Sequence, residues 1–212
     1  MQSARGPLTF ADYQRIYTVL YATLQAAEAR THRACIFFTI VGAAILRKDH
    51  GLQAQIVAGA AAYSFDDAGR QLVSFGRLED GYFRCRPDAF HAWIECEGFV
   101  IDFMAPIFQD ALRADGHGLT VPRRMFQKPV SAAVAGMPDP THRGEFCLVP
   151  DQGRTGEIKA AFGAAEMNAD LGSLAMTWYK PPPRKIKAEF QFNDTEGLRT
   201  ATLRAPALDG TW

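Results

Sequence analysis

Two helical patterns open the chain. Apolar residues recur at steps of three and four over residues 10–29, which predicts an amphipathic helix. Thr9 precedes this pattern and Asp12 follows it three residues later, as is typical of a helix N-cap with an acid in the first turn. Residues 34–49 are apolar on nearly every side, so they predict a buried helix that a basic turn and Gly51 bring to an end.

Beyond residue 51 the pattern changes to short segments rich in strand-forming residues. Residues 52–65 and 70–78, joined by DDAG, predict one hairpin, and residues 90–96 and 99–104 predict another. Further along, the pattern predicts a short helix at 107–115, strands near 123–132 and 144–150, helices within 154–179, an extended loop at KPPPRK and a final hairpin of 185–194 with 198–205. The order of helix, buried helix and antiparallel meander predicts an α+β fold.

Length and composition favour a single domain over residues 1–212. The core at 8–106 carries the candidate chemistry, and 107–212 is expected to complete the sheet and a cleft. The 23 basic and 23 acidic residues cancel, which gives no reason to expect a nucleic acid or an anionic membrane as partner. The start has no apolar signal-peptide region, and the longest apolar run, 34–46, is too short to cross a bilayer. Four cysteines without a CxxC pair fit free thiols, so we expect a cytoplasmic protein, of unknown oligomeric state.

The hairpin at 90–104 contains two ionisable groups within strands otherwise suited to a core. Side chains alternate faces along a strand, and a turn at 97–98 sets Trp93 opposite Asp102. His91 is then the diagonal neighbour of Asp102 on the same face, within reach of a contact between imidazole and carboxylate. The other face is wholly apolar and is expected to be core.

A carboxylate that holds an imidazole fixes its tautomer and stabilises its charged form, which is the orienting half of a catalytic triad. The chain has no GxSxG motif to present a serine, so Cys35 is the candidate nucleophile. It lies in the first turn of the buried helix, where free N–H groups and the helix dipole favour a thiolate. The alternatives stay open: His91 as a half-exposed histidine, Asp102 as a surface acid, Cys35 as a small core residue, and Trp93 as either a wall of the site or a packing residue.

A metal site is the competing interpretation of the same region. The candidate ligands would be His32, Cys35, Cys85, His91 and Cys96. Their spacings match no tight zinc-ligand pair, and Cys96 falls on the apolar face of the hairpin. We therefore expect neither a metal nor another cofactor.

Taken together, these segments resemble a known superfamily. A cysteine that begins a buried helix, then GLQAQIVAG, HAWIE and VID, is similar to the transglutaminase-like branch of the papain-like cysteine enzymes over residues 30–106. The chain is also similar to a bacterial family of unknown function within that superfamily. The resemblance implies a papain-like or transglutaminase-like core, with the cysteine helix on an antiparallel sheet. It also implies a thioacyl intermediate, with Cys35 as nucleophile, His91 as general base and acid, and Asp102 as the orienting acid.

Two departures from the superfamily concern the lead-in to the cysteine. Ala29 stands where papain-type enzymes have a glutamine that donates to the oxyanion, and THRAC replaces the RGG-type lead-in of the arylamine acetyltransferases. The oxyanion hole is therefore assigned to the backbone N–H of Cys35 with an unidentified second donor.

The sequence thus predicts a thiol-dependent acyl-transfer enzyme that hydrolyses a peptide or amide bond, with a peptide or amide substrate as its partner. Acyl transfer to an amine is one alternative. A binding module that keeps the fold without catalysis is the other.

Overall fold

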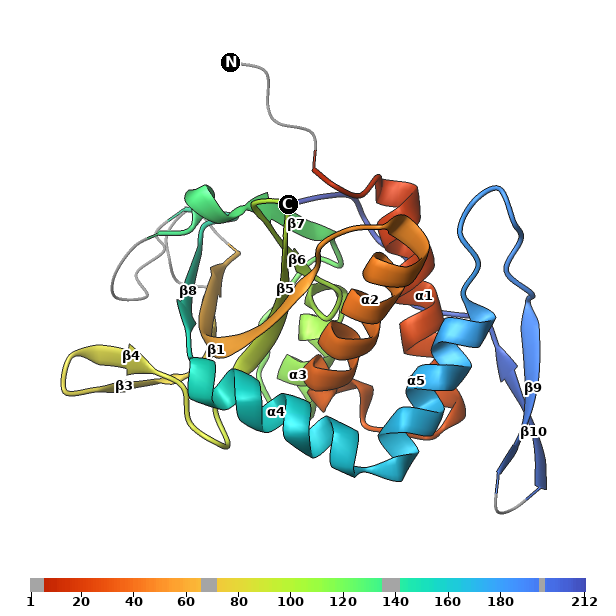
Figure 1. The fold of residues 1–212 in the computed structure, drawn as a ribbon. Coiled ribbons are helices and arrows are strands. Elements are labelled where there is room, and N and C mark those ends of the chain that lie inside the picture. The colour runs from red at the N-terminus through yellow and green to blue at the C-terminus, as the bar shows by residue number, and fades with distance from the viewer. Residues whose placement is uncertain (1–5, 66–71, 135–141, 195–196) are drawn as a thin grey trace.

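Helices pack against a curled antiparallel sheet in this protein (Figure 1). The computed structural model describes residues 6–65, 72–134, 142–194 and 197–212. The helices are α1 (Phe10–Ala26), α2 (Cys35–His50), α3 (Phe108–Ala114), α4 (Gln152–Ala164) and α5 (Glu166–Trp178), with 3-10 turns η1 (Thr31–Arg33), η2 (Ala105–Ile107) and η3 (Val130–Ala132). The strands are β1 (Gln55–Ser64), β2 (Leu72–Phe75), β3 (Arg77–Glu79), β4 (Tyr82–Arg84), β5 (His91–Cys96), β6 (Phe99–Asp102), β7 (Phe126–Pro129), β8 (Phe146–Pro150), β9 (Glu189–Asp194) and β10 (Gly197–Thr202). The mixture of helices with an antiparallel sheet confirms the predicted α+β class.

The main sheet of the described chain has six strands, and they come from both halves of the sequence. Its order is β2-β1-β5-β6-β7, and β8 pairs with β1 along residues 59–63. All of its pairings are antiparallel. The long strand β1 therefore joins the first hairpin, the β5–β6 hairpin and the second half of the chain.

The first two helices begin and end where local sequence signals predict. The Oγ1 of Thr9 accepts from the backbone N–H of Asp12 at 3.1 Å and so caps α1. Gly51 ends α2 in the left-handed conformation at φ 67°, which a glycine adopts without strain. Both helices bury an apolar face against the sheet and each other, in one continuous core.

Helix α2 approaches the β5–β6 hairpin closely because Gly42 has no side chain. A Cβ at this position would lie 2.7 Å from Cδ2 of Phe103 and 3.3 Å from Cδ1 of Ile94. This close approach fixes the distance between α2 and the hairpin that carries His91 and Asp102.

The β5–β6 hairpin has the predicted register. Cys96 lies opposite Phe99 and Ile94 lies opposite Ile101, with the turn at residues 97–98. The diagonal placement of His91 and Asp102 follows from this pairing.

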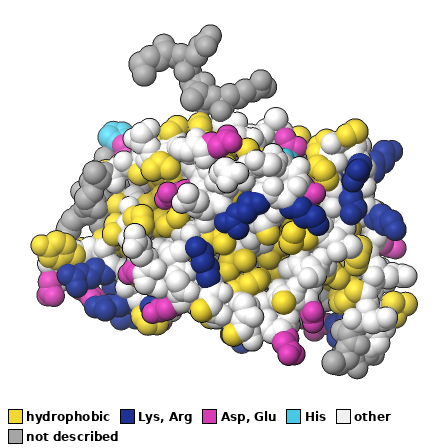
Figure 2. All heavy atoms as spheres, in the orientation of Figure 1, with side chains coloured by type: hydrophobic (Ala, Val, Ile, Leu, Met, Phe, Trp, Pro, Cys, Tyr) yellow, Lys and Arg dark blue, Asp and Glu magenta, His cyan; other side chains and the backbone are white. Residues whose placement is uncertain are grey.

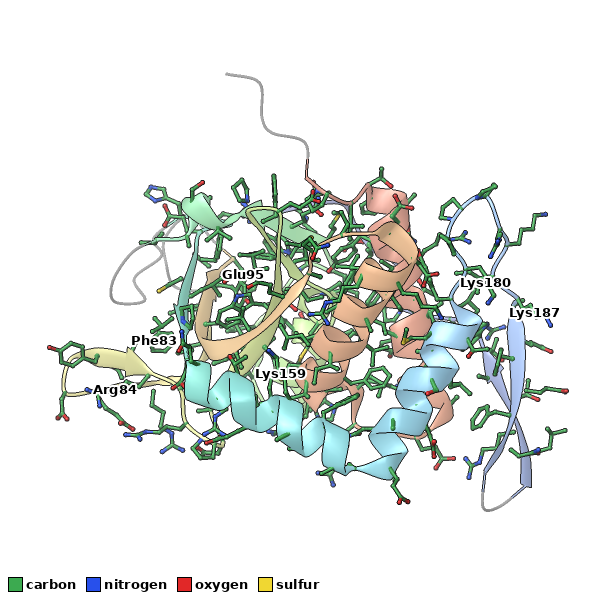
Figure 3. All side chains as sticks on the ribbon, viewed as in Figure 1. Phe83, Arg84, Glu95, Lys159, Lys180 and Lys187 are labelled. Carbon is green, nitrogen blue, oxygen red and sulfur yellow. The ribbon has the colours of Figure 1, made fainter. Side chains whose placement is uncertain are left out.

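The predicted hairpin of 52–65 with 70–78 needs one correction. β1 and β2 do pair, although the DDAG turn lies outside the described residues. The predicted second strand is split at Gly76 into β2 and β3. Gly76 packs so closely against the ring of Phe83 that a Cβ there would lie 2.6 Å from it. β3 then pairs with β4 in a separate hairpin that carries Phe83 and Arg84 and projects from the main body (Figure 3).

The predicted elements of the second half are found in order. The strand predicted near 123–132 is shorter than expected, as β7 and η3, and the proline-rich segment forms a loop between α5 and β9. β9 and β10 form a separate two-stranded sheet beside the helices (Figure 1). Acidic and basic side chains are interspersed over the face seen in Figure 2, and none of the described helices is long and apolar enough to span a membrane.

Candidate active site

His91 and Asp102 form a buried pair on neighbouring strands. His91 begins β5 and Asp102 ends β6, so the hairpin register brings their side chains together. The Nε2 of His91 lies 2.7 Å from Oδ2 of Asp102. Both side chains are almost completely buried, with 0% and 1% exposed. Neither residue is therefore the exposed group that the alternative interpretations required.

Two further donors hold the carboxylate of Asp102, and a third holds its backbone. Its Oδ1 accepts from the backbone N–H of Met104 at 2.9 Å. Its Oδ2 accepts from the hydroxyl of Tyr63 at 3.2 Å, and the hydroxyl of Tyr13 donates to its backbone oxygen. The two bonds to the carboxylate stabilise a buried negative charge, which would otherwise be costly.

Aromatic rings enclose the imidazole of His91. The ring of Phe75, on β2, stacks on it with centroids 4.5 Å apart and planes 24° apart. The rings of Phe108 and Tyr63 meet it edge-on, at 5.5 and 6.0 Å. The imidazole therefore has one fixed orientation, with Nε2 toward Asp102.

The charged form of His91 is favoured despite this burial. Burial lowers the pKa of His91, but the charge and hydrogen bond of Asp102, and then the nearby thiol of Cys35, raise the pKa to about 10. The imidazolium is thus the favoured form at neutral pH.

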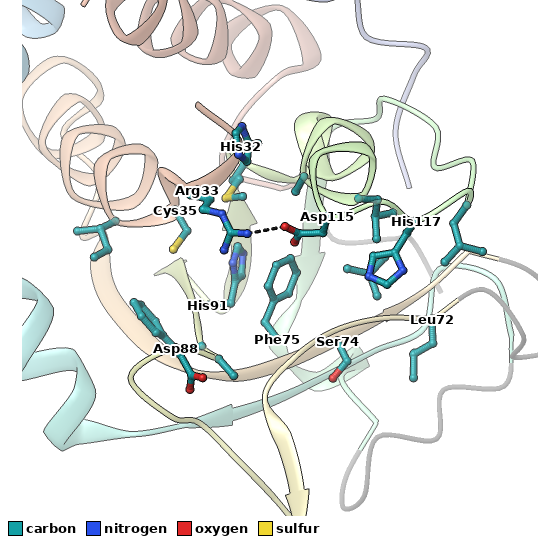
Figure 4. Close-up of a pocket in the computed structure, with 18 of the residues that line it drawn as sticks. His32, Arg33, Cys35, Leu72, Ser74, Phe75, Asp88, His91, Asp115 and His117 are labelled. Atoms are coloured by element: carbon teal, nitrogen blue, oxygen red, sulfur yellow. Dashed lines mark hydrogen bonds and ion pairs between the residues drawn. The ribbon is translucent and has the colours of Figure 1, made fainter. Parts of the chain in front are cut away.

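Cys35 is the first residue of α2 and lies beside the imidazole (Figure 4). Its thiol contributes to the raised pKa of His91, while Nδ1 of His91 is buried and forms no hydrogen bond in the described chain. Because Nε2 is bonded to Asp102, Nδ1 is the ring nitrogen left for the thiol. Contacts of this kind are often loose without a substrate and tighten in the complex.

The N-terminus of α2 offers hydrogen-bond donors next to the thiol. The cap residue Ala34 supplies no side-chain hydrogen bond. The first N–H groups of a helix have no partner inside it, so those of Cys35 and Ile36 are suited to an oxyanion.

A cavity of about 650 Å³ opens at the thiol. Cys35 and His91 both line it, and Cys35 is 8% exposed. The walls come from η1, the start of α2, β2, the segment before β5, and α3 with the residues that follow it. An ion pair between Arg33 and Asp115 lies within the group of residues that line the cavity (Figure 4).

Trp93 does not line this cavity. Its side chain is fully buried, and its Nε1 donates to Oε1 of Glu95 at 3.1 Å. Of the two roles expected for Trp93, a wall of the site that could contact substrate or a packing residue, its burial and its absence from the cavity lining favour packing. The reason is its place on the strand: His91 lies at the end of β5 that faces the cavity, and Trp93 lies two residues further in.

Of the candidate metal ligands, His32 lines the same cavity as Cys35 and His91, whereas Cys85 and Cys96 do not. Cys96 is buried in the core, and the thiol of Cys85 donates to Oδ2 of Asp151. Within the described residues, no group of three or more His, Cys, Asp or Glu side chains is placed to hold a metal ion.

Comparison with known proteins assigns the chain to a family. Residues 9–212 match the family described as "Protein of unknown function (DUF2026)". The chain belongs to the DUF2026 family. A crystal structure of the genomics target APC5867 is similar to it, with a TM-score of 0.82 and 30% sequence identity over 100% of both chains. No curated protein matches it.

Sequence reasoning missed several residues of this DUF2026 site. Tyr63, Phe75 and Phe108 enclose His91, yet they come from three elements that no spacing rule connects to it. Tyr63 is the one with a signal, because it ends the apolar stretch AGAAAY and is a polar group in a strand that the pattern predicts to be buried.

Proposed function

We propose that this protein is a thiol-dependent acyl-transfer enzyme that hydrolyses a peptide or amide bond. Cys35 is the nucleophile, His91 the proton carrier, and Asp102 the residue that orients His91. One observation carries the proposal: the buried imidazole bonds to Asp102 through Nε2, lies beside the thiol of Cys35, and borders a cavity of about 650 Å³.

The charge state of the pair is suited to nucleophilic attack. A neighbouring imidazolium stabilises a thiolate, and the thiolate is the reactive form of cysteine. The sulfur of Cys35 would attack the carbonyl carbon of a substrate bound in the cavity and form a tetrahedral intermediate. The negative oxygen of that intermediate would be stabilised by the free N–H groups at the start of α2.

Proton transfer by His91 completes the reaction. The imidazolium gives its proton to the nitrogen of the leaving amine as the C–N bond breaks, which leaves a thioacyl enzyme and a neutral imidazole. The neutral imidazole then takes a proton from water, whose oxygen attacks the thioester. The carboxylic acid leaves, and Cys35 and His91 return to their starting state.

The arrangement of elements supports a papain-like or transglutaminase-like core. The nucleophile begins a buried helix, and the histidine and the aspartate follow on adjacent antiparallel strands against which that helix packs. A silent binding module is disfavoured because the thiol of Cys35, although part of the core, borders a cavity and is 8% exposed.

Alkylation of the cysteines tests the proposal. Each thiol is reacted with iodoacetamide from about pH 5 to pH 9, in the wild type and in His91→Ala. We expect Cys35 to react rapidly even at about pH 6, and to lose this reactivity in His91→Ala.

Cys85 is the internal control for this experiment. It is more exposed than Cys35, yet burial and the hydrogen bond to Asp151 raise the pKa of its thiol. If Cys35 reacts faster than Cys85 at low pH, the cause is therefore the reactivity of its thiol and not its exposure to the reagent. If Cys35 reacts no faster than Cys85, or if His91→Ala leaves its rate unchanged, the proposed ion pair does not exist.

A further inference from the structure

A tyrosine hydroxyl shares the carboxylate oxygen that His91 uses. Oδ2 of Asp102 lies 2.7 Å from Nε2 of His91 and accepts from the hydroxyl of Tyr63 at 3.2 Å. The other oxygen, Oδ1, accepts from the backbone of Met104. His91 and Tyr63 therefore share a single carboxylate oxygen.

The position of Tyr63 is fixed by packing. It lies near the end of β1 and is 2% exposed. Its ring meets Phe126 edge-on at 5.1 Å and Phe108 at 5.0 Å. Burial, and then the charge of Asp102, raise the pKa of Tyr63 well above its usual value, so the hydroxyl keeps its proton and remains a donor.

Few other ionisable groups face His91. Asp102 on β6, Cys35 on α2 and Tyr63 on β1 interact with it, whereas β2 and α3 present the uncharged rings of Phe75 and Phe108. The other ionisable residues that line the cavity are His32, Arg33, Asp88, Asp115 and His117. Of these, Arg33 pairs with Asp115, and Asp88 pairs with Arg77.

We propose that Tyr63 is a positioning residue that weakens the hold of Asp102 on the proton of His91. The inference rests on the proposed function, in which His91 must both release a proton and take one up. A hydroxyl that donates to a carboxylate stabilises its charge and lowers its basicity. Since a general acid works best with a pKa near the operating pH, Tyr63 offsets part of the upward shift that Asp102 imposes.

Titration of His91 by NMR tests this role. The imidazole signal of His91 is identified as the one that disappears in His91→Gln. Its position is then followed against pH in two proteins, Cys35→Ala and the double variant Cys35→Ala with Tyr63→Phe. The Cys35→Ala background removes the coupled titration of the thiol. We expect Tyr63→Phe to move the midpoint of His91 upward by about half a pH unit or more, because Oδ2 is then left to His91 alone.

Tyr17→Phe in the same background is the matched control. Tyr17 is also fully buried, and its hydroxyl has no hydrogen-bond partner in the described chain. Its substitution should leave the midpoint of His91 unchanged. A midpoint that stays constant or falls in Tyr63→Phe overturns the inference.

The result of the His91 titration does not depend on whether the protein is catalytically active. Failure of Cys35 to react rapidly at low pH would remove the proposed function, while the titration of His91 would still report on Tyr63. If Tyr63→Phe does not fold, 3-fluorotyrosine is incorporated at all tyrosines of the Cys35→Ala protein. Its more acidic hydroxyl is a stronger donor, so the midpoint of His91 should fall, and a rise or no change would contradict the role assigned to Tyr63.

Discussion

Gly42→Ala should loosen the contact that positions α2 against the β5–β6 hairpin. The added Cβ would lie 2.7 and 2.9 Å from two ring carbons of Phe103 and 3.3 Å from Cδ1 of Ile94. Carbon atoms in contact are ordinarily about 3.5–4.0 Å apart, so the helix and the ring must separate by about 1 Å. The ring cannot swing aside easily, because Phe103 is buried and its centroid lies 4.8 Å from that of Tyr13.

Two opposing effects set the magnitude of this change. Alanine is favoured over glycine inside a helix by about 1 kcal/mol. Overpacking of a well-packed core costs about 1–3 kcal/mol. We expect the second effect to prevail and the free energy of unfolding of Gly42→Ala to fall by up to about 2 kcal/mol. Because α2 carries Cys35 and Phe103 follows Asp102, the alkylation rate of Cys35 at pH 6 should fall by about tenfold or more.

Urea unfolding and iodoacetamide alkylation measure the two effects. Gly156→Ala in α4 is the control, since a Cβ there would have no atom within 4 Å. That substitution should stabilise the protein by about 0.5–1 kcal/mol without changing the reactivity of Cys35. The reasoning is refuted if Gly42→Ala is as stable as the wild type and keeps its alkylation rate.

Two further predictions concern the buried pair. The pKa of His91 is about 10 in the folded protein and about 6.5 in an unfolded chain, so its stabilising effect should be complete below about pH 6.5 and lost as the pH rises through 10. The difference in unfolding free energy between the wild type and His91→Gln should narrow over this range, and a difference that widens would contradict the raised pKa. Asp102→Asn should lower the unfolding free energy at pH 7 by about 3–5 kcal/mol, because it leaves a buried imidazole without its ionised partner. Chemical unfolding measures this loss, and a change below about 1 kcal/mol would argue against a charged pair.

Local signals predicted much of the fold. Thr9 and Gly51 mark helix ends through chemistry that acts within a few residues, and the two-residue turn at 97–98 fixes the register of its hairpin. The contact between His91 and Asp102 could be predicted for the same reason, since it depends only on that register. The close packing of Gly76 against Phe83 could not, because Phe83 belongs to the following hairpin.

The surroundings of the candidate site were beyond sequence reasoning. Alternation along β5 places Trp93 on the same face as His91, but it does not show where along the strand a cavity opens. The full burial of His91 and the hydroxyl of Tyr63 at Asp102 depend on the curl of the sheet, which brings β1, β2 and α3 around one imidazole. Contacts of that kind join elements without a fixed spacing.

The pairing of β8 with β1 and of β7 with β6 means that the chain cannot be divided without exposing strand edges. A fragment that ends at residue 106 would retain the cysteine helix and the hairpin of His91, but β1 and β6 would each lose a neighbour. Strands left with unpaired N–H and C=O groups recruit other chains, so such a fragment should aggregate. The smallest unit that can be transplanted into another protein is therefore the sheet with both of its halves, and insertions are better placed on the projecting β3–β4 hairpin.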